Sequence, residues 1–176
     1  VGTGTLMIEF GSWNEDFLAF TPTVPLKSAS IDIGSGENTL AGIRDKINAA
    51  DAGVTAAILN DSQGSRLVLR STATGAEGGF RITATDDDSN PLDDSGLSRL
   101  AFNPPVGAPA SGNQRAIDLV GSVNGAPVTS ASNQLDDLIE GVSVQVIRTT
   151  TSPVDVDVAR DTESMKTLIQ QFVGAY

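Results

Sequence analysis

The side chains that most often perform acid–base catalysis or hold a transition metal are missing from this chain. Its 176 residues include no histidine and no cysteine, which excludes imidazole bases, thiolate nucleophiles and disulfides. The sequence has no nucleophile elbow, phosphate-binding loop or dinucleotide fingerprint, and Gly34-Ser35-Gly36 is interpreted as a turn. We therefore expect a protein that is not an enzyme and that needs no cofactor.

One acidic run, residues 86–94, has the residue types that could bind calcium. Asp86, Asp88 and Asn90 have the alternate spacing of an EF-hand loop. Pro91, however, occupies the position of the turn glycine, and Leu97 that of the bidentate glutamate. We interpret the run as a solvated acidic loop, with a weak nonstandard calcium site as the alternative.

Two other features admit a functional interpretation, but a structural one is stronger. Asp155 and Asp157 could supply a carboxylate pair for glycoside hydrolysis, yet their alternation with valines places both on the wet face of one strand. Trp13 follows the first apolar strand and could be an exposed recognition residue. We expect instead that its ring caps a small core and that its N–H is satisfied at the sheet edge.

The charge balance limits the possible partners. With 22 acidic and 11 basic residues the chain carries a formal charge of −11, and its basic residues are scattered rather than gathered on a segment that could neutralise phosphates. No apolar run approaches the length that spans a bilayer, and the first residues show no basic segment followed by an apolar one. We expect neither nucleic-acid binding nor membrane insertion.

The composition favours a β-rich fold. The chain is 39% apolar but contains only six phenylalanines, one tryptophan and one tyrosine, so its core must consist mainly of aliphatic side chains. Eighteen glycines and eight prolines suit the many sharp turns that connect short strands. These observations predict an α+β protein.

Residues 39–71 carry the clearest local pattern. Behind the capping candidates Asn38 and Thr39, apolar residues recur at helical spacing: Leu40, Ile43, Ile47 and Ala50. Gly53 can then leave the helix with a positive φ. The segments 54–59 and 66–70 follow with a period of two and predict a hairpin joined by turn-forming residues.

Several segments, in this order along the chain, resemble the flagellar filament cap protein family, FliD. One is similar to the Ile-Asn-Gly, Ser-Asn, Asp-x-Ile-x-Gly-Val motif of flagellar axial proteins, with Val123 in place of the usual isoleucine. The resemblance covers most of the chain. It is carried by residues 39–71, Val1–Gly11, Gly96–Leu100, Val123–Asn133, Asp137–Val142, Val158–Glu163 and Ile169–Tyr176.

A stretch rich in Pro, Gly, Ala and Ser, residues 103–114, predicts a linker and a domain boundary. We expect two small β-rich domains, each with strands and a short helix, followed by the start of a helical stalk. Residues 1–106 would form a first outer α+β domain, residues 107–160 a second domain, and residues 161–176 the beginning of the stalk helix.

Within the second domain, the pattern predicts a strand pair through Val123 and Val128. A small helix would follow, holding Leu135, Leu138 and Ile139. Alternating valines then predict a hairpin between residues 142–146 and 154–158, with one wet face.

The last predicted element is an amphipathic helix beginning at Thr162. Its apolar residues fall on one helical stripe and are the candidates for packing in the stalk: Met165, Leu168, Ile169, Phe172 and Val173. The sequence reaches Tyr176 without a stop signal. We therefore expect the natural protein to continue, and the stripe to pack on a helix outside this sequence.

The resemblance implies a structural subunit of the bacterial flagellar filament cap. Such a protein would lie outside the cell at the flagellum tip, self-associate through a coiled-coil stalk into a cap oligomer, and assist the assembly of flagellin. The alternative that we keep is a secreted adhesin or glycan-binding module that recognises host-surface glycans.

Overall fold

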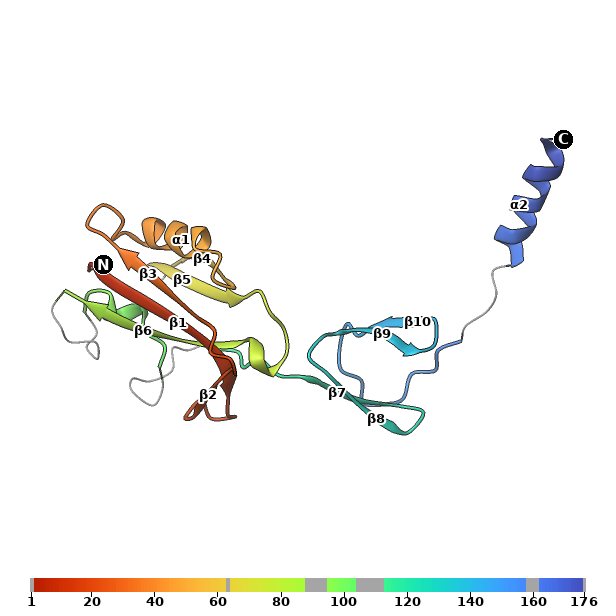
Figure 1. Cartoon of the computed structure of the whole chain (residues 1–176), viewed down its shortest axis with the longest axis horizontal. Coiled ribbons are helices and arrows are strands. Elements are labelled where there is room, and N and C mark those ends of the chain that lie inside the picture. Colours follow the sequence, from red (N-terminus) through yellow and green to blue (C-terminus); the bar gives the residue numbers. More distant parts are fainter. Residues whose placement is uncertain (1, 63, 88–94, 104–112, 158–161, 176) are drawn as a thin grey trace. The chain divides into compact units, whose positions relative to one another are not determined.

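The computed structural model describes residues 2–62, 64–87, 95–103, 113–157 and 162–175 (Figure 1). The chain divides into two compact units, Val1–Gln145 and Val146–Tyr176. Residues 88–94 of the acidic run, residues 104–112 of the predicted linker and residues 158–161 lie outside the described residues.

The first unit is built on an antiparallel sheet whose central strand is β1 (Gly4–Trp13). Over residues 4–9 this strand pairs with both β3 (Ser28–Ile33) and β6 (Gly79–Asp86), and so lies between them. The short strand β2 (Phe20–Pro22) pairs with the C-terminal end of β1. Since side chains alternate along a strand, β1 presents Leu6, Ile8 and Phe10 to a single buried face.

The helix and hairpin predicted over residues 39–71 are confirmed. Helix α1 (Leu40–Ala49) begins behind Thr39, whose hydroxyl oxygen accepts a hydrogen bond from the N–H of Gly42 at 3.0 Å. Strands β4 (Val54–Asp61) and β5 (Gly64–Ser71) then form an antiparallel pair. Gly53, between the helix and β4, has a φ of +76°, as its predicted role requires.

The hydrophobic core lies between the sheet, α1 and the β4–β5 hairpin. Its largest fully buried side chains are Leu6, Ile8, Ile43, Ile47 and Leu97. Two short 3₁₀ helices, η1 (Ala76–Gly78) and η2 (Ser98–Leu100), flank β6 in sequence. Among the described residues, every buried hydrophobic side chain belongs to positions 6–97.

Four further strands follow, in two separate hairpins. Strand β7 (Leu119–Val123) pairs with β8 (Ala126–Ser130), which confirms the predicted strand pair. Strand β9 (Gln134–Ile139) pairs with β10 (Val142–Gln145). The apolar residues of these strands are half-buried or exposed.

The small helix predicted around Leu135, Leu138 and Ile139 is wrong, because these residues belong to β9. The register of β9 against β10 shifts through a β-bulge, and Asp137 within it has a φ of +50°. Extra residues in a bulged strand allow Leu135 and Leu138, three positions apart, both to be half-buried. In the sequence alone, where strand pairing is not visible, this spacing indicates a helix.

The predicted hairpin between residues 142–146 and 154–158 is also wrong for the residues that the structure describes. Strand β10 pairs with β9, and residues 153–157 form no strand. Alternating valines and aspartates are compatible with an extended backbone, but they do not specify a partner strand. The α+β class is confirmed, whereas the described part of the predicted second domain contains no helix.

Helix α2 (Thr162–Gly174) in the second unit confirms the helix predicted from Thr162. Glu163 lies in its first turn, where a carboxylate favours the positive end of the helix dipole. Neither this nor any other helix among the described residues has the length and apolar character needed to cross a bilayer.

Candidate functional site

The clearest candidate surface of the chain is the apolar side of α2, which we call the α2 stripe. No side chain of this helix is buried among the described residues. The stripe consists of the large apolar side chains, which are 62–71% exposed: Met165, Leu168, Ile169, Phe172 and Val173. Their spacing places them on one helical face, as predicted.

Physical reasons favour a partner for this surface. Covering a side chain of this size stabilises a protein by about 1.5–3 kcal/mol, and a helix of 13 residues is marginally stable in water by itself. The polar contacts of α2 are weak in comparison. Lys166 lies 3.9 Å from the carboxylate of Glu163, and Thr167 donates to the carbonyl oxygen of Glu163 at 2.9 Å. The packing role of the stripe stays a prediction.

Asp86, the first member of the acidic run, has a structural role. Its Oδ2 atom accepts hydrogen bonds from the N–H groups of Leu97 and Ser98, both at 3.1 Å, and from the Ser98 hydroxyl at 3.0 Å. This buried carboxylate thereby fastens the turn before η2 to the end of β6. Within the described residues no cluster of three or more acidic side chains could hold a metal ion. The rest of the run, residues 88–94, lies outside them.

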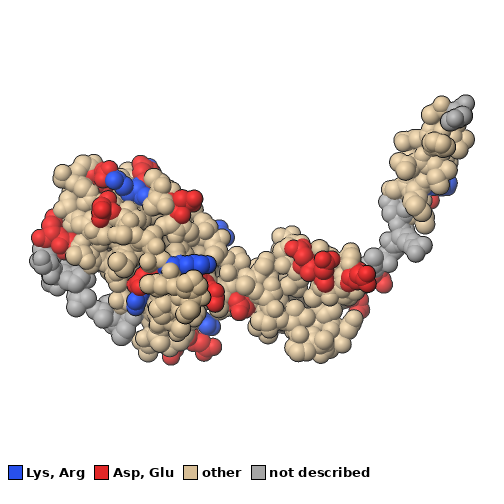
Figure 2. Space-filling view, viewed as in Figure 1, with Lys and Arg blue, Asp and Glu red and all other residues tan. Residues whose placement is uncertain are grey.

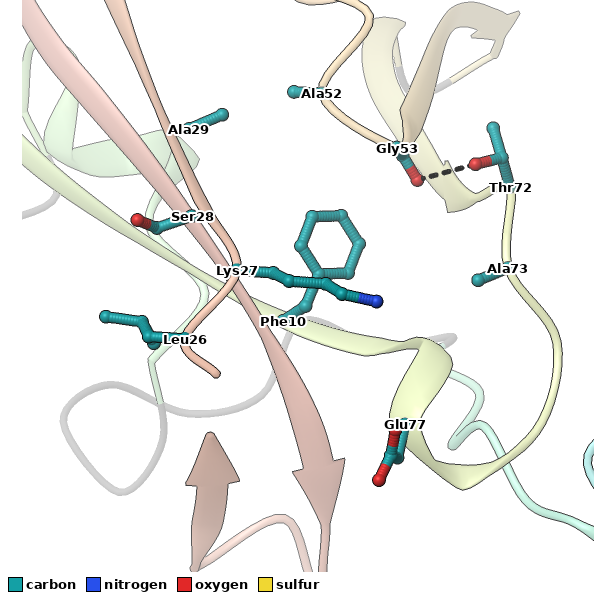
Figure 3. Close-up of a pocket in the computed structure, with 10 residues that line it drawn as sticks. All are labelled: Phe10, Leu26, Lys27, Ser28, Ala29, Ala52, Gly53, Thr72, Ala73 and Glu77. Carbon is teal, nitrogen blue, oxygen red and sulfur yellow. Dashed lines mark hydrogen bonds between the residues drawn. The ribbon is translucent and has the colours of Figure 1, made fainter. Parts of the chain in front are cut away.

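A hollow of about 460 Å³ opens beside β1, the start of β3 and the segments that flank the β4–β5 hairpin. Figure 3 shows the ring of Phe10 in it, with the side chain of Lys27 extended across the ring and Glu77 at one end. The hydroxyl of Thr72 donates to the carbonyl oxygen of Gly53 at 3.1 Å. The Thr72 hydroxyl is thus bonded to the backbone, and the lining includes no histidine or cysteine.

The structural interpretation of Trp13 is confirmed. Its side chain is only 5% exposed, and its indole N–H donates to the carbonyl oxygen of Phe80 at 2.8 Å. The ring lies 4.9–5.9 Å from those of Phe17, Phe20 and Phe102. Trp13 therefore caps one end of the sheet and is not available as a recognition residue.

Two ion pairs of the first unit also have structural roles. The ammonium of Lys46 lies 3.0 Å from Glu37 and, by hydrogen bonding, holds the pKa of that carboxyl below its ordinary value. The guanidinium of Arg81 bonds Glu9 at 2.7 Å and lies 5.0 Å from the ring centre of Phe20. Figure 2 shows acidic atoms over the region of β9 and β10, and no basic residue occurs in the sequence between Arg115 and Arg148.

Sequence reasoning did not single out two polar residues that connect elements. Asn48 of α1 bonds both the N–H and the C=O of Ala56 in β4, at 2.7 and 3.0 Å. The carboxylate of Asp118 accepts from the N–H of Ala76, at 2.7 Å, and so caps η1. A single sequence gives little signal for either contact. Asparagine and aspartate are also common in turns, so their presence does not reveal a bond between distant elements.

Two family models match separate parts of the chain. The flagellin hook IN motif matches residues 23–73, which include β3, α1, β4 and β5. The C-terminus of flagellar hook-associated protein 2 matches residues 120–176, from β7 to α2. Both descriptions concern the bacterial flagellum.

Curated relatives carry the same name. The B-type flagellar hook-associated protein 2 of Pseudomonas aeruginosa is 39% identical over 160 residues, which are 85% of this chain and 33% of that protein. Flagellar hook-associated protein 2 of Escherichia coli is 29% identical, over 84% of this chain and 31% of that protein. The chain thus spans about a third of the length of these relatives.

Solved structures agree with the model. The crystal structure of FliD from Pseudomonas aeruginosa matches with a TM-score of 0.68 and 35% identity, over 99% of this chain and 74% of that one. The flagellar cap protein FliD of Escherichia coli matches with a TM-score of 0.69, over 100% of this chain and 46% of that one. At 24% identity, this second match supports the fold alone.

The α+β sheet with its hook IN motif and the match from β7 to α2 define a bacterial flagellar protein. The chain belongs to the flagellar hook-associated protein 2 family, FliD. The resemblance inferred from the sequence is therefore confirmed. These relatives are named as flagellar hook-associated or flagellar cap proteins, and their names give no support to the adhesin alternative.

Proposed function

We propose that this chain is part of a flagellar filament cap that assists flagellin assembly at the filament tip, outside the cell. The observation that carries the proposal is the 35% identity to FliD of Pseudomonas aeruginosa over 99% of the chain. The similar Escherichia coli structure is of a flagellar cap protein. The chain would act by shape and contact, without enzymatic chemistry.

The α2 stripe would connect the chain to the rest of the cap. We propose that Met165, Leu168, Ile169, Phe172 and Val173 pack on a helix of the stalk, and that the stalk supports self-association into the cap oligomer. Their 62–71% exposure supports this role, since a stripe of this size is stabilised by a helical partner. Residues 1–106 and 107–160 would then form the two outer domains, and residues 161–176 the start of the stalk.

The proposal predicts that Leu168→Asp with Phe172→Asp, in the full-length protein, abolishes swimming. Packing on the stalk would bury two unpaired carboxylates, which is strongly unfavourable, so α2 would remain without its helical partner. We would measure swimming in soft agar, filament length by electron microscopy and the oligomeric state of the purified protein by sedimentation. Loss of all three is expected.

Gln170→Asp with Gln171→Asp is a matched control, because it adds the same charge on the opposite side of α2. This control should swim and assemble normally. Normal swimming, filament length and oligomeric state in the Leu168/Phe172 variant would contradict the proposal.

A further inference from the structure

The two edges of the β4–β5 hairpin differ in the residues that the structure describes. The N–H and C=O groups of Ala56 both bond the side chain of Asn48, at 2.7 and 3.0 Å, so they point away from β5. This asparagine and its helix cover the outer edge of β4 at Ala56. Within the described part of the chain, β5 pairs with β4 and with no other strand.

The register identifies the free backbone groups of β5. Ala56 lies opposite Leu69. Because Ala56 directs its N–H and C=O groups away from β5, the two residues form a non-hydrogen-bonded pair, and the N–H and C=O groups of Leu69 also point away from β4. Alternation along the strand then assigns the outward N–H and C=O groups to Ser65, Leu67, Leu69 and Ser71. These four residues form a row of donors and acceptors that can accept another strand.

The side chains of β5 restrict which strand would fit. Residues 65–71 read Ser-Arg-Leu-Val-Leu-Arg-Ser, the same in both directions around Val68. Leu67 and Leu69 are half-buried against the core. The opposite face is exposed and carries an arginine on each side of Val68. Arg66 is paired with Asp61, whereas Arg70 makes no ion pair among the described residues.

A second copy of the chain is a poor partner for this edge. If two β5 strands paired about a twofold axis at Val68, the symmetry would set Arg66 opposite Arg70 of the partner strand at both ends. Like charges directly opposite each other destabilise a strand pair. A strand with carboxylates at these two positions would instead complement both arginines, which are among the few basic residues of a chain with 22 acidic and 11 basic side chains.

We propose that the open edge of β5 binds an extended peptide segment in which two carboxylates flank a short apolar stretch. The segment would add to the hairpin as a third, antiparallel strand. Backbone hydrogen bonds to residues 65–71 would supply most of the affinity, and Arg66 and Arg70 would select for the acidic side chains. The inference goes beyond the cap function and does not depend on it.

The test uses the intact protein and a synthetic peptide, Thr-Glu-Val-Thr-Val-Glu-Thr, whose glutamates would face the two arginines. Titration followed by NMR should show binding with a Kd below about 1 mM. Amide hydrogen exchange at Leu67 and Leu69 should slow at least about tenfold at saturation, because their N–H groups become bonded.

Three controls separate strand addition from general attraction. The same peptide with lysines in place of glutamates should bind at least about tenfold more weakly. A glutamate peptide with both valines N-methylated should not bind, since it lacks the N–H groups that face Leu67 and Leu69. Arg70→Glu should weaken binding of the glutamate peptide, whereas Arg148→Glu, the same charge change in the other unit, should leave it unchanged.

Several results would overturn the proposal. One is the absence of binding up to about 2 mM peptide. Another is equal binding of the glutamate, lysine and N-methylated peptides, or binding without slower exchange at Leu67 and Leu69. Equal weakening by Arg70→Glu and Arg148→Glu would show a general charge effect. A dimer of the protein formed through β5 would show that a second copy occupies the edge.

Discussion

Gly53 is a position where backbone conformation and side-chain packing require the same residue. Its φ of +76° lies in the region that L residues other than glycine rarely adopt. A Cβ atom built there would lie 3.0 Å from Cζ of Phe10, a core residue. Gly53 thereby lets the chain leave α1 and enter β4 directly over the ring of Phe10.

Gly53→Ala should therefore lower the free energy of unfolding by about 1–3 kcal/mol. Both the strained φ and the contact with Phe10 contribute. Urea denaturation followed by circular dichroism would measure the change. Gly36→Ala is the control, because nothing lies within 4 Å of its Cβ position and its φ is not in the left-handed range. Equal stability of the two variants would contradict this account.

At the scale of elements, one side-chain amide adds a polar link between α1 and β4 to their apolar packing. Asn48 lies in the last turn of the helix and donates to the C=O of Ala56 while it accepts from the N–H of the same residue. Ala56 is only 7% exposed, so water has little access to replace these bonds. The same contact covers β4 at Ala56, whereas β5 pairs with no strand other than β4 among the described strands.

Asn48→Ala should destabilise the protein by about 1–3 kcal/mol, because it leaves two backbone groups of Ala56 unsatisfied. Thermal or urea unfolding would give the value. Asn60→Ala is a suitable control, since Asn60 bonds Ser65 at an exposed position. Hydrogen exchange adds a local readout, because the amide of Ala56 should exchange faster in the Asn48 variant. An unchanged Ala56 amide would show that the contact does not form.

At the scale of the whole molecule, the buried core is confined to one part of the sequence. Every buried hydrophobic side chain of the described chain lies at positions 6–97, and the strands from β7 to β10 have none. Burial of apolar surface is the main favourable contribution to folding. The two parts should therefore differ in their ability to fold alone.

A fragment of residues 1–114 should fold and unfold cooperatively, because it retains the whole core. A fragment of residues 115–176 should lack cooperative unfolding, because its strands and α2 cover no buried core in this chain. Circular dichroism during urea titration and the dispersion of amide NMR signals would decide. A cooperative transition in the second fragment would contradict the prediction.

The sequence by itself determined the elements whose signals are local. The cap at Thr39, the helical spacing from Leu40 to Ile47 and the glycine at 53 are encoded within a few residues of each other, and all three appear as predicted. The amphipathic α2 and its stripe were predicted for the same reason. The family, too, was inferred from short motifs in a fixed order.

Only the tertiary structure decided what depends on pairing between distant segments. Leu135 and Leu138 are three positions apart, a spacing that is typical of a helix in the sequence alone. In the structure the bulge in β9, which forms on pairing with β10, interrupts the strand period of two and produces this spacing. The bond from Asn48 to Ala56 and the open edge of β5 likewise depend on register and on packing across the chain. A side-chain pattern defines faces, but which edge is covered is fixed by the long-range contacts made on folding.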